Sequence, residues 1–194
     1  MTKLNTITTD ITIKVPLEKT WEALYTHFGD VSLFNPNLSD SYFTNATFGI
    51  VGSERECRID KKSYFRERIS RVDPLKNFTI ELTRGNLPLV KTMQLDVLFY
   101  QLDPCYTFIT IVAHINIRPA IMRFLMKGIY KSKLNDMLIG LKYYLETGKT
   151  VTKSSYHLVF QNYQLLKANE SFEDIQVPKN KLCSDCTICC NCQK

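Results

Sequence analysis

Two spacings of apolar residues organise the chain. A helix is predicted at residues 16–28, because Pro16 can open a helix and apolar residues then follow at intervals of four, three and four: Leu17, Trp21, Leu24 and Phe28. Residues 5–15 precede it and alternate loosely between apolar residues and threonines, which predicts a first strand. The single tryptophan, Trp21, is expected to anchor the core.

Six further strands are predicted before residue 118. Apolar and polar residues alternate in most of them, and turns rich in Gly, Pro, Asn or Asp separate several of them. The last strand is apolar on both faces, as is typical of a strand that is covered on both sides. These strands are expected at residues 41–47, 54–59, 64–72, 78–83, 92–99 and 105–117.

The longest helical pattern begins at Pro119 and continues to about Glu146. At about 1.5 Å per residue, such a helix spans roughly 40 Å, enough to cross a whole sheet. Its predicted apolar stripe consists of Ile121, Phe124, Leu125, Gly128, Ile129, Met137, Leu138, Leu141 and Leu145. The order strand, helix, six strands, long helix predicts an α+β fold in which a curved antiparallel sheet wraps around the last helix.

One predicted hairpin, residues 54–72, carries two charges on its apolar face. Alternate residues of a strand share a face, so Arg55 lies with Cys57 and Ile59, and Glu67 lies with Phe65 and Ile69. A turn with an odd number of residues makes these two faces coincide. A turn at residues 61–63 would pair Cys57 with Glu67 and place Arg55 diagonally across from Glu67, within reach of long side chains.

An inward-facing Arg55 and Glu67 have two interpretations. Burial of an ion costs several kcal/mol, and a buried ion pair is weak evidence for stability, so retention of both charges favours a functional role. The alternative is a local break in the alternation, or an ordinary ion pair at a hydrated rim.

Composition and charge narrow the function classes. The chain has 194 residues, of which 44% are hydrophobic and 11% aromatic, enough for one sizeable core. It has no apolar run of about 18 residues and no apolar signal-peptide core at residues 1–5, so we expect an intracellular, cytoplasmic protein. The net charge of +6 is spread along the chain, and no nucleic-acid-binding motif accompanies it.

Several short segments, in this order and spacing, resemble the SRPBCC superfamily, also called START or birch-pollen-allergen-like. The resemblance is strongest to its polyketide cyclase/dehydrase and lipid-transport branch and covers about residues 5–148, so residues 1–148 are interpreted as one helix-grip domain. The segments are Val15-Pro16, Phe28-Gly29-Asp30-Val31, Asn35-Pro36, Gly52-Ser53-Glu54-Arg55, Glu67-Arg68-Ile69, Asp73-Pro74, Leu87-Pro88 and Leu141 to Gly148.

The resemblance implies an internal ligand cavity between the sheet and the long helix. The residues expected to bind a ligand there are Arg55, Cys57, Phe65, Glu67, Met93, Leu95, Phe99 and Phe124. The favoured hypothesis is binding or transfer of a hydrophobic small molecule, such as a lipid, an isoprenoid or a polyketide-like compound, without a cofactor in the domain.

The alternative hypothesis is a cyclase, dehydratase or isomerase. Plant members similar to lachrymatory factor synthase carry an arginine and a glutamate at positions that align with Arg55 and Glu67. In such an enzyme Glu67 would move a proton and Arg55 would stabilise an oxyanion. Replacement of Glu67 by glutamine would then abolish turnover, whereas a binding protein would keep its affinity.

Residues 149–194 lie beyond the resemblance and are interpreted as a largely flexible extension, in which residues 156–166 have enough apolar side chains for a short docked strand or helix. Its last residues contain a dense cluster of cysteines: Cys183, Cys186, Cys189, Cys190 and Cys192. Their thiolates could hold zinc or copper(I), which would be a third class of function. The alternatives are reversible acylation, which would bring peripheral membrane contact through the tail, redox sensing, or no defined role.

Overall fold

The computed structural model of the protein describes residues 5–45 and 49–173. Seven antiparallel strands form one sheet in the order β1-β7-β6-β5-β4-β3-β2. The strands are β1 (Asn5–Ile13), β2 (Asp40–Phe43), β3 (Glu54–Arg58), β4 (Tyr64–Asp73), β5 (Asn77–Gly85), β6 (Val90–Asp103) and β7 (Tyr106–Ile117). Each strand after β2 pairs with its predecessor in the chain, and β1 closes the series against β7.

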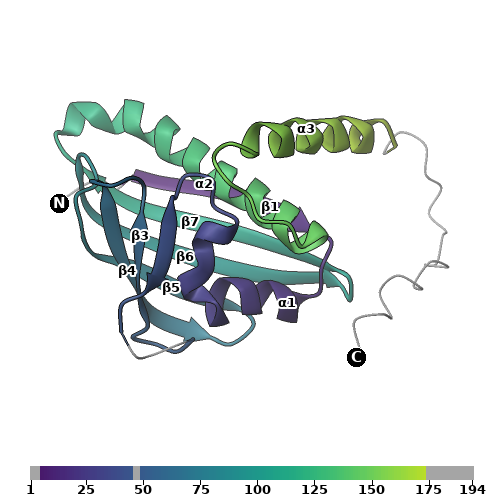
Figure 1. Ribbon diagram of the computed structural model, residues 1–194, viewed down its shortest axis with the longest axis horizontal. Coiled ribbons are helices and arrows are strands. Elements are labelled where there is room, and N and C mark those ends of the chain that lie inside the picture. The colour runs from purple at the N-terminus through teal and green to yellow at the C-terminus, as the bar shows by residue number, and fades with distance from the viewer. Residues whose placement is uncertain (1–4, 46–48, 174–194) are drawn as a thin grey trace.

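The helices lie between β1 and β2 and after β7. The first group contains α1 (Leu17–Trp21), the π-helical turn η1 (Glu22–Thr26) and the 3-10 segment η2 (Phe28–Leu33). The second contains η3 (Ala120–Met122), α2 (Arg123–Thr147) and α3 (Tyr156–Glu173). The long helix α2 runs along the curved sheet (Figure 1), which confirms the predicted α+β helix-grip architecture.

The core lies between the sheet and the helices. In β7 the residues at alternate positions from Thr107 to Ile117 are buried, and the residues between them are half-buried on the other face. Trp21 anchors an aromatic cluster, since its ring centroid lies 4.7 Å from that of Tyr25, 5.7 Å from that of Phe78 and 5.2 Å from that of Phe99. Such contacts fix the start of the helical segment between β1 and β2 against β5 and β6, two interior strands of the sheet.

The central hairpin has a different turn from the predicted one. Arg55 pairs directly with Glu67, and Cys57 with Phe65. The turn consists of Asp60, Lys61 and Lys62, because the Asp60 carboxylate accepts hydrogen bonds from the backbone N–H groups of Lys62 at 2.7 Å and Ser63 at 2.8 Å. An aspartate that bonds backbone groups two and three residues ahead favours a turn over a strand. The predicted odd turn length and shared face are confirmed, but the predicted register is wrong.

The first half of α2 presents a different face to the sheet from the predicted stripe. Met122, Met126, Tyr130 and Leu134, spaced by four, pack against the core. Ile121 and Phe124, which belong to the predicted stripe, are 85% and 93% exposed. The prediction holds in the second half, where Leu138 and Leu141 are buried.

The chain continues past α2 and returns to the body of the fold. Gly148 ends the helix with a left-handed φ of 71° that glycine adopts without strain, and its N–H donates to the carbonyl of Tyr144. Val151 is 1% exposed and its N–H donates to the carbonyl of Leu33 at 2.8 Å. Residues 149–159 therefore dock on the fold, and the predicted domain boundary at residue 148 stays a prediction.

No helix in the described ranges is both long and apolar enough to cross a membrane.

Candidate functional site

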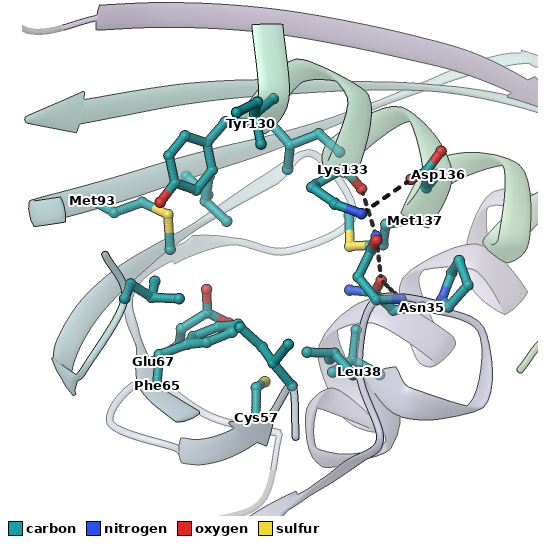
Figure 2. A pocket seen from close by; sticks show the side chains of 18 of the residues that line it. Asn35, Leu38, Cys57, Phe65, Glu67, Met93, Tyr130, Lys133, Asp136 and Met137 are labelled. Atoms are coloured by element: carbon teal, nitrogen blue, oxygen red, sulfur yellow. Dashed lines mark hydrogen bonds and ion pairs between the residues drawn. The ribbon is translucent and has the colours of Figure 1, made fainter. Parts of the chain in front are cut away.

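A pocket of about 560 Å³ lies between the sheet and α2. Its floor comes from β3, β4, β6 and β7, and α2 covers it. Figure 2 shows Cys57, Phe65 and Glu67 on one side of the pocket, opposite Tyr130 and Met137 of α2. The segment between η2 and β2, residues 35–39, and the turn that contains Leu87 and Pro88 complete the wall. Most of these side chains are apolar, which suits an apolar ligand.

The ion pair of Arg55 and Glu67 lies in the wall of the pocket. The two residues face each other across β3 and β4 and are 6% and 2% exposed. Arg55 donates twice to the same carboxylate oxygen, from Nε at 3.0 Å and from Nη2 at 2.7 Å to Oε2 of Glu67. These two charge-assisted bonds fix both buried side chains relative to each other.

Phe28 holds the other side of the guanidinium. Arg55 Nη1 donates to the carbonyl oxygen of Phe28 at 2.8 Å, and Cζ lies 3.9 Å from the centroid of the Phe28 ring. The ring face attracts the cation, and the carbonyl oxygen accepts a hydrogen bond from an N–H group that would otherwise be buried without a partner. The start of η2 therefore orients Arg55 on the sheet.

Glu67 offers a ligand a carboxylate oxygen that Arg55 does not occupy. Both bonds from Arg55 end on Oε2, and Figure 2 shows a carboxylate oxygen of Glu67 directed into the pocket. A ligand hydroxyl could donate to this oxygen. Glu67 would in that case stay bonded to Arg55.

Cys57 lines the pocket next to this pair but is a poor nucleophile. Burial raises the pKa of its thiol to about 12, an effect that the charge of Arg55 only partly opposes. The thiol therefore stays protonated near neutral pH, and since the thiolate is the reactive form, Cys57 acts as a small apolar wall residue.

Polar residues gather at another part of the pocket wall, where α2 meets the segments before β2 and at the start of α3. Asn37 Nδ2 donates to the carbonyl of Lys133 at 3.1 Å and to Oδ1 of Asn35 at 3.1 Å. The Tyr156 hydroxyl donates to Oδ1 of Asp136 at 2.7 Å. Its pKa is raised mainly by burial and, to a smaller extent, by this hydrogen bond. The bond of Asn37 to Lys133 connects the segment before β2 to α2, and the bond of Tyr156 to Asp136 connects α3 to α2.

Six of the eight residues expected to bind a ligand line the pocket: Arg55, Cys57, Phe65, Glu67, Met93 and Leu95. The other two lie elsewhere. Phe99 is part of the aromatic cluster, with its ring centroid 5.9 Å from that of Phe78, because β6 extends beyond the pocket at that end. Phe124 is 93% exposed because the opposite side of α2 faces the sheet.

The residues expected to bind a ligand did not include those that α2 and the extension contribute to the pocket. Met126, Tyr130, Leu134 and Met137 line the pocket, and the spacing of four in the first three was the available signal. Lys153 and Tyr156 also line it, although they lie beyond residue 148. No periodic pattern in residues 149–155 indicated this contact.

The predicted zinc or copper(I) site of Cys183, Cys186, Cys189, Cys190 and Cys192 lies outside the described residues. Within residues 5–45 and 49–173, no group of three or more His, Cys, Asp or Glu side chains is placed to hold a metal ion.

Comparisons with known proteins identify the fold. No protein-family model matches the chain, and no curated protein matches it in sequence. Among solved structures it is similar to Ara h 8.0201, with a TM-score of 0.63, 13% identity, and 75% of this chain and 99% of that chain covered.

Two further similar structures come from a bacterium and a plant. For a START superfamily protein from Mycobacterium smegmatis the TM-score is 0.63 at 10% identity, with 73% of this chain and 97% of that chain covered. For the major latex-like protein 151 of Panax ginseng it is 0.62 at 16% identity, with the same coverage of 73% and 97%. The chain therefore has the helix-grip fold of START and birch-pollen-allergen-like proteins, and identities this low show the fold alone.

Proposed function

We propose that the protein binds or transfers a hydrophobic small molecule in the pocket between the sheet and α2. The pocket itself carries the proposal: its volume of about 560 Å³ lies within the usual range of roughly 300–1,000 Å³ for ligand sites. Its apolar wall would supply affinity, since each apolar Å² removed from water contributes about 25 cal/mol.

The polar wall residues restrict the ligand to one with a polar end. The carboxylate oxygen of Glu67 that points into the pocket would accept a hydrogen bond from a ligand hydroxyl. Desolvation of this oxygen without a partner would oppose binding. Lipids, isoprenoids and polyketide-like molecules with a hydroxyl group meet both requirements, and they suit the polyketide cyclase/dehydrase and lipid-transport branch that the sequence resembles.

The contacts of Arg55 and Glu67 support a role in ligand binding better than a role in catalysis. Arg55 already donates to Glu67 and to the Phe28 carbonyl, and the protonated Cys57 offers no nucleophile. Both hydrogen bonds from Arg55 end on Oε2 of Glu67, so the carboxylate is held in one position in the wall of the pocket. The pair is therefore assigned to orientation of a ligand.

Tryptophan substitutions at two neighbouring positions of β6, Met93 and Gln94, test the proposal. Met93 lines the pocket, whereas Gln94 lies on the other face, where its amide donates to Asp96. Because an indole would fill part of the pocket, Met93→Trp should weaken binding of the neutral fluorescent probe N-phenyl-1-naphthylamine by about tenfold or more, equivalent to about 1.4 kcal/mol. Fluorescence titration measures this.

Gln94→Trp is the matched control and should leave the probe affinity within about twofold of wild type. Thermal unfolding of both variants would establish that they fold. Equal loss of probe binding in the two variants, or a folded wild-type protein that does not bind the probe, would refute binding in this pocket.

A further inference from the structure

The first turns of α2 and the segment before them expose a group of apolar side chains. Ile121, Phe124, Leu125 and Ile129 are 85%, 93%, 60% and 44% exposed. They are spaced by three, one and four residues, so they form one stripe on a helix. The stripe lies beside, not within, the row of Met122, Met126 and Tyr130 that packs against the core. We call these four residues the apolar stripe.

Basic residues surround the apolar stripe. Residues 114–135 contain no Asp or Glu, and neither do residues 82–95. The hydrogen bond from Arg118 N–H to the Leu89 carbonyl, 2.9 Å long, brings these two segments together. They carry Arg84, Lys91, Arg118, Arg123, Lys127, Lys131 and Lys133. Among the described residues Lys133 alone of these forms an ion pair, with Asp136 at 3.9 Å.

This combination fits one kind of partner. Exposed Phe, Ile and Leu on a helix with Lys and Arg beside them are typical of helices that lie in the interface of a bilayer. Each basic residue near an anionic lipid surface contributes about 1 kcal/mol, whereas a basic rim opposes self-association through this face. Figure 1 shows the first turns of α2 at the far left of the molecule, whereas α1 and α3 lie farther to the right.

We propose that this end of the molecule, the apolar stripe with its basic rim, docks on the surface of an anionic lipid bilayer. Ile129, together with Met126 and the turn residues Leu87 and Pro88, also lines the pocket. Docking therefore places one end of the pocket next to the lipid. The inference goes beyond the proposed function and does not depend on it, because bilayer binding needs no ligand in the pocket.

Flotation with vesicles tests the inference on the full chain. The protein, expressed in a bacterial host, should bind vesicles of phosphatidylcholine with phosphatidylserine at least tenfold more tightly than vesicles of phosphatidylcholine alone. High salt should reduce this binding, since it screens exposed charges. The double variant Phe124→Ser/Leu125→Ser should weaken it by about tenfold or more, because both side chains lose their apolar contact with lipid. Lys127→Gln/Lys131→Gln should also weaken it by about tenfold or more.

Matched controls come from other exposed positions. Leu165 and Leu166 on α3 are 64% and 54% exposed, and Leu165→Ser/Leu166→Ser should leave vesicle binding unchanged. Arg71→Gln/Lys76→Gln, near the β4–β5 turn at the other end of β4, removes two exposed charges far from the stripe and should also have little effect. All four pairs are exposed, so each variant should fold.

Three results would overturn the inference. The first is a wild-type protein that does not bind phosphatidylserine vesicles, or binds them as well after Phe124→Ser/Leu125→Ser. The second is a wild-type dimer, detected by light scattering, that this double variant converts to a monomer, because a second copy would then cover the stripe. The third is vesicle binding that is lost when the five tail cysteines become serine, which would make the tail the anchor.

Discussion

Replacement of Gly140 by alanine is expected to destabilise the domain by about 3 kcal/mol. Gly140 lies in α2 where the helix crosses the end of η2. A Cβ atom there would overlap with the carbonyl oxygen of Phe34 and lie 3.4 Å from Cδ of Pro36. The obstacle is backbone, and it has little freedom to move, since Phe34 is 2% exposed and the carbonyl of Leu33 next to it accepts the N–H of Val151.

Gly128→Ala is the matched control on the same helix. No atom lies within 4 Å of a Cβ built at Gly128, so alanine should raise stability by about 1 kcal/mol through its higher helix propensity. Chemical denaturation measures both changes in the free energy of unfolding. If Gly140→Ala were as stable as the wild type, the close approach of α2 to Phe34 would be wrong, and so would the wall of the pocket at residues 35–39.

Replacement of Arg55 by methionine is expected to cost about 3–5 kcal/mol of stability, because it leaves the carboxylate of Glu67 buried without its partner. Glu67 is 2% exposed, and both of its bonds come from Arg55. The double variant Arg55→Met/Glu67→Leu removes both charges and should recover most of the loss, since apolar residues of similar volume often replace a buried pair without cost.

Arg58→Met is the control for loss of an arginine from the same strand. The Arg58 side chain is 43% exposed, and its partner Glu56 keeps a bond from Arg66 Nε at 3.0 Å, so the change should cost less than about 1 kcal/mol. A double-mutant cycle in urea measures the coupling of Arg55 and Glu67. A double variant no more stable than Arg55→Met would mean that the two side chains do not act as a pair. Loss of probe binding in a stable double variant would assign the pair to the ligand.

The hairpin illustrates how far the sequence could predict the site. Alternation placed Arg55 and Glu67 on one face, because the period of two holds in any register with an odd turn. The register itself depended on a local choice, the bonds from Asp60 to the backbone of Lys62 and Ser63, which alternation does not describe. A shift of two residues in the pairing of β3 with β4 changed a diagonal contact into a direct one.

In the long helix, by contrast, the sequence predicted the element but not which face of its first half packs against the sheet. Two apolar stripes start side by side in residues 119–134, and only one continues at a regular spacing of four into Leu134 and Leu138. The predicted stripe was the other one, because a stripe that faces lipid and a stripe that faces a core use the same types of residue. The missed wall residues Met126 and Tyr130 and the misplaced Phe124 have this one origin. Lys153 was missed because irregular segments carry no period, and Tyr156 was missed because it begins a helix that lies beyond the resemblance.

The central claim is that the pocket holds a hydrophobic small molecule, and the mass of the protein tests it most directly. Protein isolated gently from its own source should show, under native conditions, an additional organic mass that disappears on denaturation. Met93→Trp should reduce the fraction of protein that carries this mass, whereas Gln94→Trp should not. A wild-type protein that keeps its native fold and shows no additional mass, even after incubation with lipid extracts from the same cells, would contradict the claim.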